Sequence, residues 1–313
     1  MVAKLQPNRV RRSYVGGGRI DAFTSFVSPC PEDWLASTTT AFNGGVEIEG
    51  EGLGRLEDGR LVRDVVGELP ILVKLLDSDE RLVVQAHPTV PFAKRFLNSP
   101  VGKTECWYFL PGTASNACVY LGFKPGVSEA IWREAVNACC ESKDAAPRLL
   151  SLLHRVPVKA GDFVFVSGGM PHAIGAGCFM IELQEPSDLM VVAERFTPSG
   201  RVIPDKKMHC GLGWDKMFDV YDYRGLEFDD LCARYVKRAP SGRILGPELT
   251  DKFSMWRLGG GDALRLERET AVAVVTDGEG DVNGCHVRKG DRLLVSAERS
   301  IALDGNVGVV ICS

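Results

Sequence analysis

The chain has 313 residues, of which 45% are hydrophobic and 25% are charged, and its formal net charge is −4. These values are typical of a soluble globular protein with more than one domain. They disfavour a nucleic-acid partner, because no basic run stands out, and a membrane span, because no stretch approaches the roughly 18 apolar residues of a spanning helix.

The N-terminal segment and the cysteines bear on the compartment. The pair Arg11-Arg12 is not followed by an apolar segment, so it is not a twin-arginine export signal. The ten cysteines include no Cys-x-x-Cys pair, which favours free thiols over a disulfide framework or a thiolate zinc site. We therefore expect a cytoplasmic protein.

The first 60 residues predict short elements. Residues 8–23 contain three consecutive glycines and indicate a strand, a turn and a second strand. Two prolines then interrupt regular structure, which places Trp34 and Ser37 in a loop or a short helix. Trp34 has two open interpretations, a lid over the core or a side chain that lines a ligand cleft.

Short β-strands dominate from residue 71 onward. Apolar and aromatic runs predict strands over 71–76, 81–87, 102–111 and 116–123. In residues 127–155, apolar positions recur at three- and four-residue spacing, which is typical of amphipathic helices. Strands with glycine turns then resume. The helices therefore form an excursion that covers one end of a β-barrel.

Two similar five-residue motifs occur in the chain. Residues 158–162 read VKAGD and precede a strand, and we interpret Gly161-Asp162 as a hairpin turn. The related VRKGD begins at Val287, 129 positions after Val158, and also precedes a strand. This internal repeat predicts two related β-barrels in one chain.

The repeat sets the expected domain organisation. We predict an N-terminal catalytic domain over residues 1–200, a mixed connector over 201–245 and a C-terminal β-domain over 246–313. The C-terminal copy has no histidine at the place that corresponds to His172. We therefore expect the second barrel to be structural and to hold no metal.

Four polar side chains on the predicted strands have the composition of a metal site. Gln85 and His87 are two residues apart, so they point to the same face of a strand. Glu105 lies in a strand where an apolar residue would be expected, and His172 begins another strand. Two imidazoles, a carboxylate and an amide oxygen suit a divalent metal, most simply Zn²⁺. Each residue alone also fits a hydrogen-bonded core position, and only their convergence on one barrel favours a metal.

Two lysines accompany these residues. Lys74 lies inside the apolar run ILVKLL, where burial of an unpaired ammonium is very costly. Lys103 shares a strand face with Glu105. Each lysine is a candidate catalytic group, and each could instead be a structural ion-pair partner of Glu105.

Four segments carry a resemblance to a known family. In chain order they read QAHP, GKTECWY, VPVKAGDFVFVSGGMPHAIGAG and IELQEPSD. This order is similar to that of the type I mannose-6-phosphate isomerases, a zinc-dependent branch of the cupin superfamily, and in particular to their short bacterial form. The match covers roughly residues 70–188, and the C-terminal third fits the family's second barrel in pattern only.

The resemblance implies a fold and a metal site. The fold would be mainly β, with two cupin-type, jelly-roll-like barrels, a helical excursion between strands of the first and a mixed linker segment. One Zn²⁺ per chain would be held by residues identical to the family's ligands, namely Gln85, His87, Glu105 and His172. Family lysines at the positions of Lys74 and Lys103 are implicated in binding the sugar or moving its proton.

The resemblance also implies a reaction. It is the interconversion of mannose 6-phosphate and fructose 6-phosphate through a cis-enediolate, in a monomer or a homodimer. The catalytic base stays open between Lys103 and Lys74. The family usually has an arginine in the substrate site where this chain has Val192, and Arg195 is the nearest substitute. The remaining substrate-binding candidates are Trp34, Ser37 and Asp188.

Other functions of this set of residues are either disfavoured or stay open. An oxygenase of the same superfamily is disfavoured, because its site tends to use more histidines and the whole chain has five. A non-catalytic protein that binds a sugar or sugar phosphate, and an isomerase of another sugar, stay open. A storage protein would not explain a lysine, a glutamine and a glutamate on buried strands.

Overall fold

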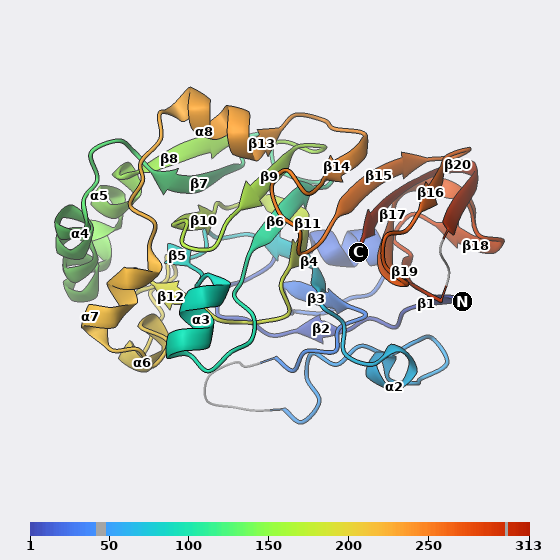
Figure 1. The fold of residues 1–313 in the computed structure, drawn as a ribbon, viewed down its shortest axis with the longest axis horizontal. Helices are drawn as coiled ribbons and strands as arrows, with labels where there is room; N and C mark the ends of the chain where they lie inside the picture. Colours follow the sequence, from blue (N-terminus) through green and yellow to red (C-terminus); the bar gives the residue numbers. More distant parts are fainter. Residues whose placement is uncertain (42–47, 298–299) are drawn as a thin grey trace.

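A computed structural model describes residues 1–41, 48–297 and 300–313. Antiparallel sheets dominate it, which confirms the mainly β fold, and helices cover one side (Figure 1). Within the described ranges the sheets are open and no closed barrel is formed. The layers run from the helices through a five-stranded and a seven-stranded sheet to an eight-stranded C-terminal sheet.

The first two sheets form a sandwich. In spatial order, the five-stranded sheet consists of β12 (Val191–Val192), β5 (Gln85–Ala86), β10 (His172–Ile174), β7 (Cys118–Phe123) and β8 (Leu153–Pro157). The seven-stranded sheet consists of β13 (Val236–Lys237), β9 (Phe163–Val166), β6 (Glu105–Phe109), β11 (Cys178–Gln184), β4 (Leu72–Ser78), β3 (Glu32–Leu35) and β2 (Arg9–Val10).

Strand alternation decides which side chains enter the sandwich. In β6, Trp107 and Phe109 pack between the two sheets, whereas Cys106 and Tyr108 pack against the C-terminal sheet. Glu105 therefore faces the interior of the sandwich, because strand side chains alternate with a period of two. The same period points Lys74 of β4 and Glu182 of β11 inward, since their neighbours in each strand pack outward.

The chain crosses between the two sheets repeatedly. Strands β8, β9, β10 and β11 belong alternately to the five-stranded and the seven-stranded sheet. The expected hairpin at Gly161-Asp162 is therefore wrong, because β8 pairs with β7 and β9 pairs with β6 and β13. Such crossing connections, rather than local hairpins, are what a jelly-roll-like sandwich requires.

The predicted helical excursion lies between the paired strands β7 and β8. It consists of α4 (Glu129–Glu141) and α5 (Ala146–Ser151). Ser128 caps α4, since its side chain accepts a hydrogen bond from Ile131 N. Trp132 of α4 packs on Phe123 of β7, so the excursion covers the outer face of the five-stranded sheet.

Other short helices surround the sheets. They are α1 (Arg19–Thr24), α2 (Val62–Val66), α3 (Val90–Phe96), α6 (Asp205–Met208), α7 (Trp214–Met217) and α8 (Phe228–Tyr235). The second strand expected within residues 8–23 is wrong, because α1 begins there, after Gly18 in the left-handed region (φ 76°). The loop or helix expected at Trp34 is also wrong, since Trp34 lies in β3 between β2 and β4.

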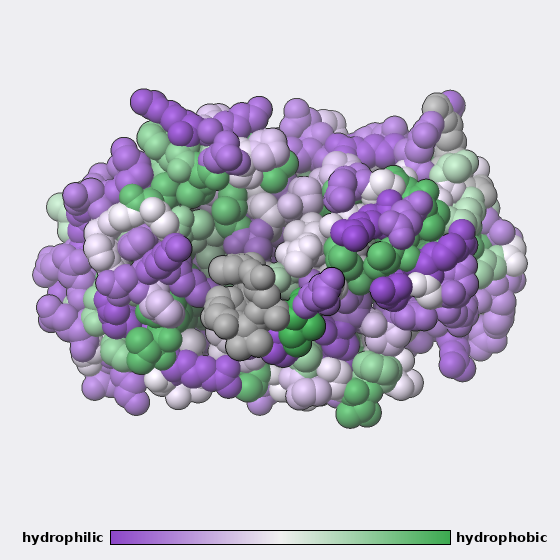
Figure 2. Space-filling model, turned by 90° about the horizontal axis from the view of Figure 1, so that it is seen from below, coloured by the Kyte–Doolittle hydropathy of each residue, from purple (hydrophilic) through white to green (hydrophobic). Residues whose placement is uncertain are grey.

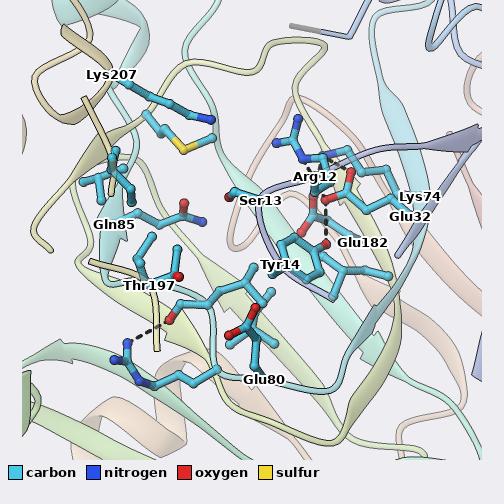
Figure 3. A pocket seen from close by; sticks show the side chains of 18 of the residues that line it. Arg12, Ser13, Tyr14, Glu32, Lys74, Glu80, Gln85, Glu182, Thr197 and Lys207 are labelled. Carbon is cyan, nitrogen blue, oxygen red and sulfur yellow. Dashed lines mark hydrogen bonds and ion pairs between the residues drawn. The ribbon is translucent and has the colours of Figure 1, made fainter. Parts of the chain in front are cut away.

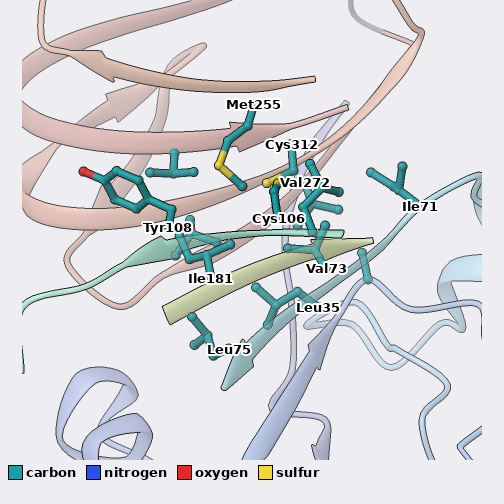
Figure 4. Packing of buried hydrophobic residues seen from close by; sticks show 14 of the residues in the cluster. Leu35, Ile71, Val73, Leu75, Cys106, Tyr108, Ile181, Met255, Val272 and Cys312 are labelled. Atoms are coloured by element: carbon teal, nitrogen blue, oxygen red, sulfur yellow. The ribbon is translucent and has the colours of Figure 1, made fainter. Parts of the chain in front are cut away.

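The C-terminal sheet packs on the outer face of the seven-stranded sheet. Figure 4 shows Cys106 and Tyr108 of β6 facing residues of the C-terminal strands such as Met255 and Cys312. This sheet consists of β1 (Val2–Lys4), β14 (Gly242–Leu245), β15 (Met255–Gly259), β16 (Ala263–Arg265), β17 (Thr270–Val282), β18 (Cys285–Arg288), β19 (Arg292–Ser296) and β20 (Ser300–Cys312). Strand β1 pairs with β19, so the first residues of the chain belong to this last sheet.

The surface matches the composition. On the face in Figure 2, hydrophilic residues predominate and hydrophobic ones gather in separate patches. No helix in the described part of the chain is long and apolar enough to cross a membrane.

The two copies of the repeated motif form the same turn. Lys159 N and Arg288 N each donate a hydrogen bond to the aspartate three residues later, at 3.0 and 3.1 Å. The glycines of both copies have similar positive φ angles, 88° at Gly161 and 91° at Gly290. This local geometry supports the interpretation of the motif as a structural repeat.

The two turn glycines predict different costs of substitution. A Cβ at Gly161 would meet nothing closer than 3.9 Å, whereas a Cβ at Gly290 would lie 2.1 Å from the Phe23 carbonyl oxygen. We expect Gly161→Ala to cost about 1 kcal/mol, the strain of a left-handed alanine. Gly290→Ala should cost roughly 1–3 kcal/mol more, because the α1 backbone must move. Urea unfolding of both variants checks this, and equal losses would contradict it.

Candidate metal centre

The predicted metal ligands converge between the two sheets of the sandwich. The register of β10 against β5 places His172 directly opposite Gln85. Glu105 reaches the same place from β6 of the facing sheet, and His87 follows β5. Ligand atoms of His87, Glu105 and His172 all lie within 4.8 Å of one another. The fold therefore brings together residues from three separate segments of the sequence.

The contacts centre on the Glu105 carboxylate. His87 Nε2 lies 3.1 Å from Oε2, and His172 Nε2 lies 3.3 Å from Oε1. The Gln85 amide nitrogen lies 3.3 Å from His172 Nε2. Because the two ends of an amide have nearly the same shape, a half-turn of this group places its oxygen at the same point.

Backbone carbonyls orient both imidazoles. His87 Nδ1 donates to Leu189 O and His172 Nδ1 donates to Met170 O, each at 2.9 Å. A proton on Nδ1 leaves the lone pair of each Nε2 directed at the cluster. This is the arrangement by which metal-ligating histidines are held in proteins.

The electrostatics of the cluster fit a cation. Burial alone would raise the pKa of Glu105, but its neighbours, first of all the Lys103 ammonium, outweigh it and hold that pKa well below its usual range. Both oxygens are buried and accept no well-formed hydrogen bond from the described residues, although Lys103 Nζ is 3.0 Å from Oε2. Burial lowers the pKa of His87 to about 4 and also lowers that of His172. An ionised carboxylate and two neutral imidazoles are the forms that bind metal.

The depressed His87 pKa predicts how the stability of the metal-free protein depends on pH. An unfolded histidine titrates near pH 6.5, whereas folded His87 titrates near 4. Between these values the unfolded chain binds a proton that the folded chain does not, so stability falls as the pH drops from 6.5 towards 4. His87 alone should contribute roughly 3 kcal/mol to this loss.

Urea unfolding of chelator-treated protein at a series of pH values measures this dependence. His87→Gln should reduce the slope in this window. The matched control is His286→Gln, because the side chain of His286 is 66% exposed, and it should leave the slope unchanged. An equal slope in His87→Gln and the unchanged protein would contradict the prediction.

The two lysines occupy different surroundings. Lys103 Nζ lies 3.1 Å from His87 Nε2, at the edge of the cluster. Lys74 is 1% exposed and donates to Glu182 at 3.0 Å, with Glu32 at 3.8 Å. Burial alone would lower the pKa of Lys74, but the two glutamates outweigh it and raise that pKa. A lysine held in its charged form suits the orientation of an oxygen better than the removal of a proton.

A cleft opens beside the cluster (Figure 3). Its empty volume is about 730 Å³ including its open mouth, which suits a small-molecule ligand. Gln85 and Lys103 belong both to the cleft wall and to the metal cluster. The other polar residues of the wall are Arg12, Ser13, Tyr14, Glu32, Lys74, Glu80, Arg81, Glu182, Thr197 and Lys207.

Several predicted substrate residues do not line this cleft. Trp34 is fully buried, and its Nε1 donates to Glu32 at 2.7 Å, which supports the core interpretation over the cleft one. Ser37 is buried and its Oγ accepts from Thr39 N. Arg195 forms an ion pair with Asp205 at 2.6 Å, away from the cleft wall, whereas Val192 lies in that wall. Asp188 contacts the cleft through Arg12.

Other residues of the wall were not predicted from the sequence. Glu182 interrupts an apolar strand, CFMIELQ, as Lys74 interrupts ILVKLL, so the same argument would have found it. Arg12 was considered only as part of an export signal. Lys207 follows another lysine in a short polar segment, and nothing in its sequence surroundings distinguishes it.

Comparisons with known proteins give sequence relatives and fold neighbours. No family model matches the chain. Mannose-6-phosphate isomerase ManA of Bacillus subtilis is 29% identical over 238 residues, which cover 72% of this chain and 69% of ManA. A mannose-6-phosphate isomerase of Streptococcus mutans is 37% identical over 119 residues, covering 38% of this chain and 34% of the relative.

The solved structures agree on the fold. A mannose 6-phosphate isomerase from Bacillus subtilis superposes with a TM-score of 0.74 at 19% identity, covering 100% of this chain and 99% of that one. A putative mannosephosphate isomerase from Archaeoglobus fulgidus gives 0.72 at 18% identity, with coverage of 99% and 96%. Together with the sequence relatives, these matches confirm the resemblance that the four sequence motifs indicated.

Proposed function

We infer that the chain is a metal-dependent mannose-6-phosphate isomerase, which interconverts mannose 6-phosphate and fructose 6-phosphate. The observation that carries this inference is the buried His87–Glu105–His172 cluster, which lies between two sheets beside a cleft of ligand size whose wall contains Gln85 and Lys103. The sequence relatives bear names of this activity. We further propose that the metal is Zn²⁺, one per chain, held by these three residues and Gln85.

The side chains of the cleft suit the chemistry of this reaction. Isomerisation moves a proton between C1 and C2 of the sugar and passes through a cis-enediolate, whose negative charge needs stabilisation. A bound divalent ion would supply positive charge for the sugar oxygens. Lys103, whose Nζ lies 3.1 Å from His87 Nε2, would transfer a proton at the sugar. Lys74, held charged by Glu182 and Glu32, would orient a sugar oxygen.

The experiment that tests this function combines activity with metal content. Purified protein is assayed with mannose 6-phosphate and with fructose 6-phosphate, and its metal is measured on the same sample. We expect turnover in both directions and close to one zinc per chain. Protein that carries zinc but turns over neither sugar phosphate would contradict the inference.

Val192, at the position where the family usually has an arginine, favours one second candidate function. A protein that lacks the usual arginine in this cleft could bind a sugar phosphate as a sensor without converting it. In that case mannose 6-phosphate would raise the unfolding temperature of the protein without any turnover. Oligomeric state and cellular compartment stay predictions of the sequence.

A further inference from the structure

Val192 leaves the cleft without a cation where one would be expected, and the same wall contains two other cations, Arg12 and Lys207. Arg12 comes from the N-terminal segment just after β2, and Lys207 comes from α6. In Figure 3 both side chains are directed into the cleft. Either side chain can bind a ligand only if some of its N–H groups are not already used by the protein.

The Arg12 guanidinium is held by two carboxylates but still has N–H groups for a ligand. Its two terminal nitrogens donate to the two oxygens of Asp188 at 2.9 and 2.8 Å, and its Nε lies 3.1 Å from Glu32. A guanidinium has five N–H groups. These contacts use three of them, so one N–H on each terminal nitrogen remains for a ligand.

Lys207 has no ion-paired carboxylate among residues 1–41, 48–297 and 300–313. Its ammonium forms no hydrogen bond or ion pair with any residue that the structure describes. Burial lowers the pKa of Lys207, and the nearby Arg12 lowers it further, while Asp188 raises it. Two cations thus lie near each other in a half-buried site, and a bound anion would relieve their repulsion.

Two other arginines near the cleft bind carboxylates. Arg81 binds both oxygens of Glu194 at 2.6 and 2.7 Å and also donates to Leu82 O. Arg195 is paired with Asp205 outside the cleft wall. Arg12 and Lys207 both keep N–H groups that no described residue accepts, and both side chains are directed into the cleft.

We propose that Arg12 and Lys207 form an anion subsite that holds the phosphate of the substrate, with Arg12 taking the place of the arginine that is absent at position 192. The identification of the anion as a sugar phosphate rests on the proposed function. Both cations are aimed at one cleft whose wall also contains the metal-cluster residues Gln85 and Lys103. A phosphate bound there would place the sugar of the same molecule beside the cluster.

The central test compares two adjacent lysines. Lys207→Met should raise the KM for mannose 6-phosphate about tenfold or more, since an ammonium–phosphate contact is lost, and should leave the KM for unphosphorylated mannose within about twofold. Lys206→Met is the matched control, because Lys206 is exposed on the same helix, and should change neither value. Inorganic phosphate should raise the unfolding temperature of the unchanged protein and of Lys206→Met, but not of Lys207→Met.

A relocation variant tests Arg12 itself. Arg12→Gln should raise the KM for mannose 6-phosphate, and adding Val192→Arg should recover part of the loss. Arg12→Gln removes the ion-pair partner of the partly buried Asp188, which destabilises the fold. If this variant does not fold, the comparison of Lys207→Met with Lys206→Met decides.

The outcomes separate the subsite from the function. If the unchanged protein isomerises mannose 6-phosphate and Lys207→Met matches it in KM and phosphate response, the subsite is overturned and the function stands. If phosphate protects the unchanged protein but not Lys207→Met, and neither turns over the sugar, the function is overturned and the anion subsite stands.

Discussion

Removal of the metal is expected to lower isomerase activity by roughly 10³-fold or more, and added Zn²⁺ is expected to restore it. The physical reason is charge: a metal cation supplies several kcal/mol of stabilisation to developing negative charge, and about 1.4 kcal/mol corresponds to a tenfold change in rate. The metal-free cluster should persist as a folded site, because Glu105 keeps contacts with Lys103, His87 and His172.

Two variants sharpen this prediction. Glu105→Gln keeps the shape of the side chain but removes its charge, so zinc content and activity should fall together. His286→Ala, on the exposed hairpin of β17 and β18, is the matched control and should keep both. Zinc should also raise the unfolding temperature of the unchanged protein and not that of Glu105→Gln. Full activity after chelation, checked by metal analysis, would refute the site.

Most residues of the metal cluster could be predicted from short-range patterns in the sequence. The period of two in strands placed Gln85 with His87 and Lys103 with Glu105 on shared faces, and the structure keeps Glu105 inward. The cost of burying an unpaired ammonium inside an apolar run pointed to Lys74. These are properties of a few consecutive residues, which is why the sequence carries them.

Long-range geometry could not be predicted in the same way. The pairing of His172 with Gln85 depends on strands that are 87 residues apart and on crossings between two sheets. The ion pair between Arg12 and Asp188 joins residues 176 positions apart. No periodicity encodes such contacts, so the sequence pointed to Arg195, which is near Asp188 in sequence, and did not reveal the pairing of Arg12 with Asp188.

Lys103→Met is expected to lower kcat by about 10²- to 10⁴-fold, the usual contribution of a general acid or base. Methionine fills a similar volume without an ammonium, so the packing beside His87 should survive. Zinc affinity should stay unchanged or increase, because Lys103 Nζ lies 3.0 Å from the Glu105 carboxylate and repels a cation bound there. The measurements are steady-state kinetics and zinc titration of the same preparation.

Lys103→Arg separates charge from proton transfer. An arginine keeps the positive charge but does not release its proton near neutral pH. If Lys103 moves a proton, Lys103→Arg should be nearly as slow as Lys103→Met, whereas near-normal turnover in Lys103→Arg would show that positive charge is sufficient. Unchanged turnover in Lys103→Met would remove the residue from the mechanism. The base would then have to be sought among other groups of the cleft wall, where Lys74 is disfavoured because Glu182 and Glu32 raise its pKa.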